Sequence, residues 1–301
     1  MQNNEFIKTY VGFLRPFLVP ALPLKIVFDF SNGATELIVP EVVKGTPSIK
    51  PIFVDRTLSG NFPAHGPNPL APKAIGHIHK EVLMHHADLG VIFDADGDRV
   101  FFIDHLGRWI PTHVIAYLLA IGAHPPYVFD TRTALSLKKS GLIPPGQVHV
   151  SPVGSIFIKE AMRRTHAGLG AEYSGHYCFE EFYMSDSGIL TALKIINAIT
   201  LLPYTVADLV DLAPVKLETE EINIESGDPG QTIAAVLSHY RGSALSLERR
   251  DGATLDFGSW FLNIRSSNTE SLVRVFAGSS DRALLARKTK EFREQFGTKT
   301  V

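Results

Sequence analysis

The sequence predicts an α/β protein in which two mixed-sheet α/β domains precede a smaller C-terminal α+β domain. In the first and middle parts of the chain, short apolar runs alternate with segments whose apolar residues recur at helical spacing. This alternation is typical of strands joined by helices. In the last part, several strand-like runs follow one another before a final amphipathic helix, which is typical of a small α+β domain.

The length and composition agree with more than one domain. The chain has 301 residues, of which 45% are hydrophobic, so it exceeds what one small core usually serves. A plausible linker, rich in glycine and proline, runs from Gly122 to Pro126. We therefore expect an α/β domain at 1–122, a second at 123–214 and an α+β domain at 215–301.

The first expected domain opens with a helix and a buried strand that ends in a polar turn, with a further helix expected after it. A loop rich in glycine and proline, a second helix and two strands around a charged turn follow, and a last helix closes the domain. The expected ranges are helix 5–18, strand 24–29, turn 31–34, loop 60–69, helix 72–87, strands on both sides of 94–99, and helix 112–121.

The remaining elements are read from the same patterns. In the second domain they are strands 127–130 and 147–150 and helices 155–164 and 187–201, and Pro203 and Pro214 bracket the exit. In the third they are helix 230–240, strands 244–247, 254–257, 260–265 and 272–277, and helix 281–296.

Charge and composition exclude several classes of function. Lys and Arg number 29 against 31 Asp and Glu, so nucleic acid is not an expected partner. The apolar stretch 188–202 contains Lys194 and ends before Pro203, short of the ~20 residues of a membrane span, and the N-terminus shows no targeting pattern. No membrane partner is expected. The single cysteine, Cys178, rules out an intramolecular disulfide, which favours a cytoplasmic location.

A charged turn between two apolar runs is the strongest chemical signal. It carries Asp94, Asp96, Asp98 and Arg99. Three carboxylates so close together repel one another unless a cation neutralises them, which indicates a divalent metal. A helix-loop-helix calcium site is excluded, because that pattern needs glycine where Arg99 stands and glutamate where His105 stands.

The turn has two competing family readings. Residues 93–97 resemble the first motif of haloacid-dehalogenase-type phosphatases, but that family expects threonine or valine where Asp98 stands. Residues 94–99 resemble more closely the Asp-Gly-Asp-Gly/Ala-Asp-Arg metal loop of the α-D-phosphohexomutase family, which includes phosphomannomutases and phosphoglucomutases. They differ from it only at Ala95.

Two further loops resemble the same family and occur in family order. Residues 171–176 are similar to its sugar-binding loop Gly-Glu-x-Ser-Gly-His, and residues 265–270 to its phosphate loop Arg-x-Ser-Asn-Thr-Glu. Carboxylate, hydroxyl and imidazole groups suit sugar hydroxyls, and an arginine fork with hydroxyls suits phosphate. Including weaker matches near residues 29–34 and 61–69, the resemblance covers residues 25–276.

The resemblance implies site residues, a cofactor and a ligand. Mg²⁺ would be bound by Asp94, Asp96 and Asp98, Arg99 would be catalytic, and the ligand would be a hexose phosphate, either mannose or glucose phosphate. The implied substrate-binding residues are Arg132, Glu172, Ser174, His176, Arg265, Ser267, Asn268, Thr269 and Arg274.

The resemblance also implies a phosphoserine that transfers the phosphoryl group between hexose 1-phosphate and hexose 6-phosphate through a bisphosphate intermediate. The family carries it in a Ser-His-Asn/Asp-type loop of its first domain, and no such loop occurs in these residues. The chain therefore corresponds to domains two to four, and we expect it to be inactive alone. It would be one subunit of a split enzyme that is completed by a separate first-domain polypeptide, a truncated or engineered product, or a non-catalytic phosphosugar-binding protein.

Overall fold

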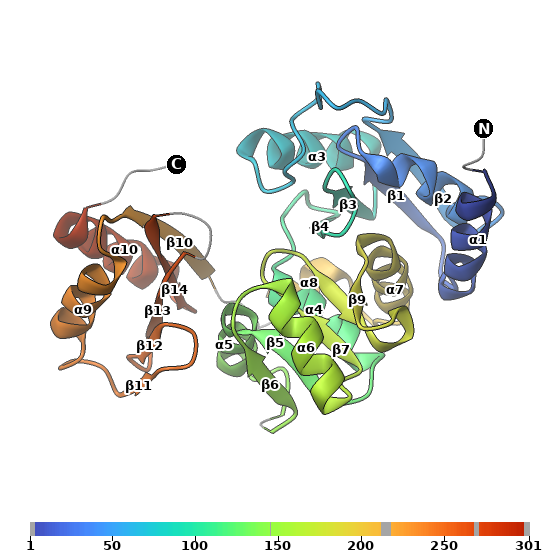
Figure 1. Cartoon of the computed structure of the whole chain (residues 1–301). Coiled ribbons are helices and arrows are strands. Elements are labelled where there is room, and N and C mark those ends of the chain that lie inside the picture. The colour runs from blue at the N-terminus through green and yellow to red at the C-terminus, as the bar shows by residue number, and fades with distance from the viewer. Residues whose placement is uncertain (1–3, 145, 212–217, 268–270, 298–301) are drawn as a thin grey trace.

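Three separate sheets organise the chain (Figure 1), as the sequence predicts. The computed structural model describes residues 4–144, 146–211, 218–267 and 271–297. The first two sheets are mixed and carry helices, and the third is antiparallel, so two mixed-sheet α/β domains precede a smaller α+β domain.

The first sheet has the strand order β2-β1-β3-β4, and its strand-end loops carry the aspartate turn. β1 (Leu24–Asp29) is parallel to β2 (Ile49–Val54) and β3 (Leu89–Phe93), and β4 (Val100–Asp104) is antiparallel to β3. Side chains alternate across the sheet. Val27 therefore packs on the side of α3 (Pro72–His85), whereas Ile26 and Phe28 join the cluster that contains α2 (Val39–Val43).

The expected helix 5–18 is shorter than predicted. α1 (Asn4–Leu14) ends before a single 3₁₀ turn, η1 (Arg15–Phe17), because Pro16 lacks the N–H that would continue the α-helical bonding. The expected helix after the turn 31–34 is split into the 3₁₀ turn η2 (Ala34–Leu37) and the short α2. Strand β2 was not predicted. Pro51 interrupts its pattern, and it is tolerated because β2 is an edge strand.

The second sheet has the order β6-β5-β7-β8-β9. β5 (Tyr127–Asp130) is parallel to β6 (Val148–Ser151) and β7 (Leu169–Ala171), and β8 (Tyr177–Phe179) pairs antiparallel with β7 and with β9 (Ser185–Asp186). α6 (Ser155–Thr165) lies on one face, and its Met162 packs with Val128 and Cys178. The other helices are α4 (Thr112–Ile121), α5 (Thr131–Ser140), α7 (Gly188–Thr200) and α8 (Val206–Asp211).

The contacts of α4 bear on the first expected boundary. α4 packs against α5, α7 and β7, all elements of the second domain, instead of closing the first one. We therefore propose that the boundary lies before α4 and not at residue 122. The second expected boundary, at residue 214, falls outside the described residues.

The first two domains share one hydrophobic core. Buried side chains of the first sheet, such as Phe28 and Val91, belong to the same contiguous cluster as Phe129, Leu193 and Ile196 of the second domain. Asn197 on α7 also donates from Nδ2 to the carbonyl of Phe17 at 2.7 Å. This shared core fixes the loops of the two sheets relative to each other.

The C-terminal domain is a five-stranded antiparallel sheet with two helices. The strand order is β10-β14-β13-β12-β11, and Tyr240 of α9 and Phe292 of α10 pack in its core. The elements are β10 (Glu218–Glu225), α9 (Pro229–Tyr240), β11 (Ser246–Glu248), β12 (Ala253–Asp256), β13 (Trp260–Ser266), β14 (Leu272–Ser279) and α10 (Arg282–Phe296). β10 was not predicted. It is an edge strand whose glutamates obscure the strand pattern, and charges of this kind discourage edge-to-edge pairing.

Candidate active site

The aspartate turn connects β3 to β4 and folds around the buried carboxylate of Asp94. Asp94 Oδ1 accepts hydrogen bonds from the backbone N–H groups of Gly97 and Arg99 at 3.0 and 3.1 Å. Its Oδ2 accepts from Arg99 Nε at 2.6 Å. Gly97 has φ +79°, which few other residues adopt without strain. The backbone thus holds Arg99 and the carboxylates in one compact turn.

The three aspartates can present a common cation site. Asp94, Asp96 and Asp98 each offer a carboxylate oxygen, and these oxygens lie within 4.8 Å of one another. Burial raises the pKa of Asp94 above its ordinary value despite the bond from Arg99, so its charged form lacks full compensation in the protein alone. An all-oxygen set with one such carboxylate fits Mg²⁺.

The loop 172–176, between β7 and β8, lies directly against the aspartate turn. Val100 N donates to the carbonyl of Gly175 at 3.2 Å, and the backbones of Arg99 and His176 form an antiparallel bridge. On the other side of the turn, Gly188 N donates to the carbonyl of Gly97 at 3.0 Å. The two loops that the sequence predicts separately therefore form one continuous surface between the first two sheets.

His176 connects the carboxylates of both loops. Its Nε2 lies 3.4 Å from Asp98 Oδ2, and its Nδ1 lies 3.2 Å from Glu172 Oε2 and 2.9 Å from Ser174 Oγ. Burial alone would lower the pKa of His176, but hydrogen bonds to Asp98 and Glu172 raise it to about 9. The bond with His176 in turn holds the pKa of Asp98 below its usual range. Because the pKa of His176 is raised to about 9, its imidazole is a cation at neutral pH.

The structure brings two residues to the site that the sequence analysis did not assign to it, Lys159 and Asp186. Lys159 on α6 lies 2.9 Å from Asp186 of β9, and one oxygen of Asp186 lies within 4.8 Å of ligand atoms of Asp98 and His176. Lys159 lies on the predicted helix 155–164. The only sequence signal for its place at the site is its positive charge on a helix that begins directly after a strand-end loop. Its ammonium group pairs with a carboxylate that lies beside Asp98 and His176.

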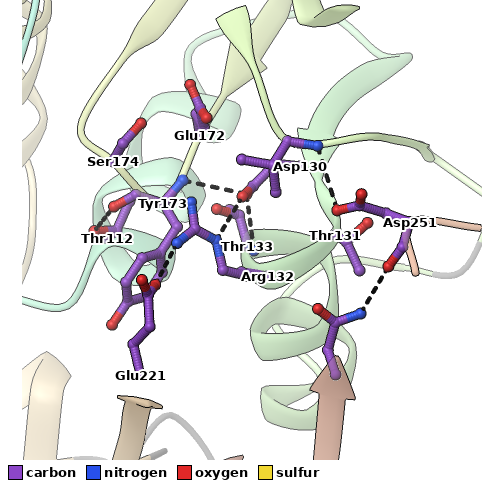
Figure 2. Close-up of polar contacts among 12 residues, drawn as sticks. Thr112, Asp130, Thr131, Arg132, Thr133, Glu172, Tyr173, Ser174, Glu221 and Asp251 are labelled. Atoms are coloured by element: carbon purple, nitrogen blue, oxygen red, sulfur yellow. Dashed lines mark hydrogen bonds and ion pairs between the residues drawn. The ribbon is translucent and has the colours of Figure 1, made fainter. Parts of the chain in front are cut away.

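Arg132 occupies a different setting from the other predicted phosphate ligands (Figure 2). It is 6% exposed, and its Nε lies 3.1 Å from Asp130 Oδ2 while its Nη1 lies 2.7 Å from Glu221 Oε2. Its guanidinium also stacks over the ring of Tyr173, 4.9 Å from the centroid. Arg132 therefore joins α5 of the second domain to β10 of the third.

Two further arginines face the same junction from the C-terminal sheet. Arg265 on β13 and Arg274 on β14 are direct cross-strand partners, so their side chains leave the same face of the sheet. Arg274 Nη1 lies 3.4 Å from Glu221 Oε1, and Arg265 Nε lies 3.9 Å from Asp251 Oδ2. Burial, followed by repulsion from Arg132, lowers the pKa of Arg265. Three guanidinium groups thus stand close to three carboxylates, those of Asp130, Glu221 and Asp251.

The remaining predicted phosphate ligands follow β13. Ser267 N donates to the carbonyl of Leu272 at 2.9 Å, which places Ser267 at the turn between β13 and β14. Asn268 and Thr269 lie outside the described residues. The structure therefore places Arg265, Ser267 and Arg274 at one end of the C-terminal sheet.

Tyr173 connects the loop 172–176 to this cluster of arginines. Its backbone N donates to Asp130 Oδ1 at 3.2 Å, its hydroxyl lies 3.0 Å from Thr219 Oγ1, and its ring meets that of Phe276 edge-on at 4.9 Å. Glu172 and Ser174 flank Tyr173 in sequence, so groups suited to sugar hydroxyls stand beside groups suited to phosphate. The arrangement can bind a polar ligand that carries a phosphate group.

Comparison with known families matches two of the three domains. The profile described as phosphoglucomutase/phosphomannomutase, alpha/beta/alpha domain II, matches residues 6–107. The profile for domain III of the same family matches residues 130–215. Among the described residues, no helix combines the length and apolar character that a membrane crossing requires.

Characterised relatives extend this similarity over most of the chain. A protein of Xanthomonas campestris named "Phosphohexose mutases" is 38% identical over 280 residues, which cover 89% of this chain and 61% of the relative. An Escherichia coli phosphomannomutase is 33% identical over 306 residues, covering 97% of this chain and 67% of the relative. The chain thus spans about three fifths to two thirds of the length of these relatives.

Solved structures share the fold. A phosphoglucomutase/phosphomannomutase family protein from Burkholderia thailandensis superposes with a TM-score of 0.80 at 23% identity, over 96% of this chain and 63% of that one. A putative phosphomannomutase from Thermus thermophilus superposes with a TM-score of 0.77 at 18% identity, over 96% of this chain and 66% of that one. The fold of nearly the whole chain is therefore shared with both.

Proposed function

Since the chain belongs to the phosphoglucomutase/phosphomannomutase family, we propose that it supplies the metal-, sugar- and phosphate-binding parts of a phosphohexomutase. Such an enzyme interconverts hexose 1-phosphate and hexose 6-phosphate, with mannose or glucose phosphate as the substrates named by the relatives. The observation that carries the proposal is the direct pairing of Arg99 with His176, which joins the aspartate turn to the sugar loop.

Each group has a part in this proposal. Glu172 accepts hydrogen bonds from hydroxyls of the hexose ring, Ser174 accepts or donates them, and protonated His176 donates to a ring or phosphate oxygen. Arg265, Ser267 and Arg274 bind the phosphate that is not being transferred, with an arginine fork matched to two of its oxygens. Asn268 and Thr269, which lie outside the described residues, are proposed for the same phosphate from the sequence alone.

Phosphoryl transfer itself requires charge stabilisation more than covalent chemistry by the protein. Arg99 is held by Asp94 at the entrance of the turn, where its guanidinium can face an equatorial oxygen of the transferring group. Asp94, Asp96 and Asp98 would hold Mg²⁺, which supplies Lewis-acid stabilisation to the same phosphoryl oxygens.

The phosphoryl carrier is the part that these residues do not include. No Ser-His-Asn or Ser-His-Asp sequence occurs among the 301 residues. We propose that the reacting serine comes from a further segment or from a separate first-domain polypeptide. The chain by itself then binds hexose phosphate and does not complete the mutase cycle.

An assay with glucose 1-phosphate and mannose 1-phosphate tests both statements. Calorimetry should detect binding of these ligands to the 301-residue chain, and no 6-phosphate should form. Adding a first-domain polypeptide should then restore turnover. If the chain binds neither glucose 1-phosphate nor mannose 1-phosphate, the proposed function is wrong. Sustained turnover by this chain alone would overturn only the part that concerns the serine.

A second candidate is a phosphosugar-binding protein without catalysis. The observation that favours it is that the sugar and phosphate groups are assembled in these residues without a serine loop. Binding that persists, with no turnover under any reconstitution, would support it. If the chain were a phosphatase of the haloacid-dehalogenase type, it would release inorganic phosphate, and Asp94→Asn would stop this release.

The proposed compartment is the cytoplasm. Cys178 is the single cysteine of the chain and is buried as a free thiol, which agrees with a reducing environment. Fractionation of cells that express the protein at its native level would test this location.

A further inference from the structure

A second cluster of metal-binding side chains lies in the first domain, apart from the aspartate turn. It consists of Asp29 at the end of β1, Asp55 directly after β2, His65 in the loop 60–69 and His77 on α3. Asp29 is fully buried, and the side chain of His65 is 1% exposed. Four chain segments thus contribute carboxylates and imidazoles to one small volume.

The distances in this cluster are those of ligands around a cation. His65 Nε2 lies 3.1 Å from both oxygens of Asp29 and 3.3 Å from Asp55 Oδ2. Two ligand atoms bound at 2.0–2.1 Å in a tetrahedral zinc site are separated by about 3.3 Å. Asp29, Asp55 and His65 can each place a ligand atom within 4.8 Å of the other two.

Ordinary hydrogen bonding does not account for all of these contacts. Asp55 Oδ2 and His77 Nε2 lie 3.0 Å apart, yet both atoms are buried and neither makes a hydrogen bond with suitable angles to any described residue. Buried polar atoms are nearly always bonded, so such a pair calls for another partner. A cation between the cluster atoms would provide one.

We propose that Asp29, Asp55 and His65 bind one Zn²⁺-class divalent cation, with His77 at its open side. The mixed imidazole and carboxylate set favours zinc over magnesium, which prefers oxygen ligands alone. His77 has a 33% exposed side chain, so the cluster has an entry from solvent. The proposal is independent of the proposed mutase function.

The cation would replace a proton. Burial lowers the pKa of His65, but its interactions with the carboxylates of Asp29 and Asp55 raise it to about 9. The imidazole is therefore protonated between two carboxylates when no cation is bound, and a ligating histidine must lose that proton.

The position of the cluster gives the cation a supporting role for the aspartate turn. Asp29 Oδ1 accepts from Ser31 N at 2.9 Å, and Ser31 Oγ donates to the carbonyl of Phe93, the residue before Asp94. Three residues after Ser31, Ala34 N donates to the carbonyl of Ala95 at 2.8 Å. A cation bound to Asp29 would fix the polar turn on which residues 94–99 rest.

Metal titration of the whole chain tests the proposal. Excess Mg²⁺ is added first to occupy the all-oxygen site, and Zn²⁺ or Co²⁺ is then titrated at pH 7.5. At least one equivalent should bind, with visible absorption for Co²⁺ that indicates a nitrogen ligand, and the variants below must assign it to this cluster and not to Asp98, His176 and Asp186. If no Zn²⁺ or Co²⁺ binds under these conditions, the proposal is wrong.

Two variants locate the site. His65→Gln should abolish this equivalent, whereas His85→Gln, on the more exposed imidazole beside Glu81 on α3, should bind as the wild type does. A folded His65→Gln protein with undiminished binding would overturn the proposal. If His65→Gln does not fold, Asp55→Asn takes its place. An anomalous-scattering map of zinc-soaked wild-type crystals is an independent test. A zinc peak away from Asp29, Asp55 and His65 would contradict the assignment.

Discussion

The carboxylate of Asp98 lies 3.4 Å from the imidazole of His176, although the two residues lie in strand-end loops of different sheets. One follows β3 of the first domain and the other precedes β8 of the second. The aspartate turn and the loop 172–176 are thus joined by a charge interaction as well as by backbone hydrogen bonds. This pair makes the site sensitive to pH.

The His176→Gln variant should change how stability depends on pH. The pKa of His176 is raised in the folded protein, so its contribution is complete below the unfolded value near 6.5 and is lost as pH rises through about 9. We expect the variant to be less stable than the wild type by about 1–3 kcal/mol at pH 6. Urea unfolding at pH 6 and pH 10 checks this, and a difference that does not shrink at pH 10 would contradict it.

Binding of Mg²⁺ should strengthen as pH rises from 5 to 7. The pKa of Asp94 is raised, mainly by burial, so protons compete with the cation in this window. Asp96→Asn should weaken binding at least tenfold, because one of three oxygen ligands loses its charge. Calorimetry with MgCl₂ measures both effects. The control is Asp211→Asn, on an exposed carboxylate of α8, which should leave the affinity unchanged.

Glu172→Gln should separate sugar binding from phosphate binding. Loss of the charged acceptor should weaken hexose phosphate binding about tenfold or more, whereas inorganic phosphate should bind as before. Equilibrium titrations with the two ligands give the comparison. Glu160→Gln changes an exposed glutamate on α6 and is the matched control. Equal losses for both ligands would argue that Glu172 acts through the fold instead.

Arg265→Ala should weaken binding of phosphate-containing ligands. A charge-assisted hydrogen bond contributes about 1.5–3 kcal/mol, which corresponds to roughly a 10- to 150-fold change in the dissociation constant. Arg250→Ala removes a half-exposed arginine that pairs with Glu248 and should have no such effect. An Arg265→Ala protein with wild-type affinity would remove this residue from the proposed phosphate site.

Glu221→Gln should have opposite effects on stability and on anion binding. Glu221 neutralises Arg132 and Arg274 across the junction of the second and third domains. Its loss should reduce the free energy of unfolding and should increase affinity for inorganic phosphate several-fold, because a competing carboxylate is gone. Glu220→Gln, on the neighbouring residue that pairs with Arg293, should not raise phosphate affinity. Calorimetry with phosphate, alongside thermal unfolding, distinguishes the two variants.

The sequence predicted two mixed-sheet α/β domains followed by an α+β domain. It also singled out the aspartate turn and the loop 171–176, which lie side by side, because each carries its signal within six consecutive residues. It did not predict β2 and β10, since Pro51 and a run of glutamates obscure edge strands whose identity depends on their neighbours. The strand pattern is a local signal, but an edge position is a property of the assembled sheet.

The setting of Arg132 shows the same limit at the level of a side chain. Asp130 stands two residues away and was visible in the sequence, but Glu221 lies 89 residues further along the chain. Only the packing of the C-terminal sheet against α5 brings that carboxylate to the guanidinium. The prediction that Arg132 binds substrate therefore stays a prediction, now with two carboxylates that a ligand would have to displace.

The cross-strand pair Arg265 and Arg274 has a practical consequence for anyone who handles the protein. Like charges that stand directly opposite each other destabilise a sheet, and an anion between them relieves that repulsion. An anion present at about one hundred times its dissociation constant would add about 2.7 kcal/mol to the apparent stability. Phosphate and sulfate buffers would thus raise the melting temperature while they occupy the proposed phosphate site, so a buffer that favours crystals would also mask the proposed binding of sugar phosphate.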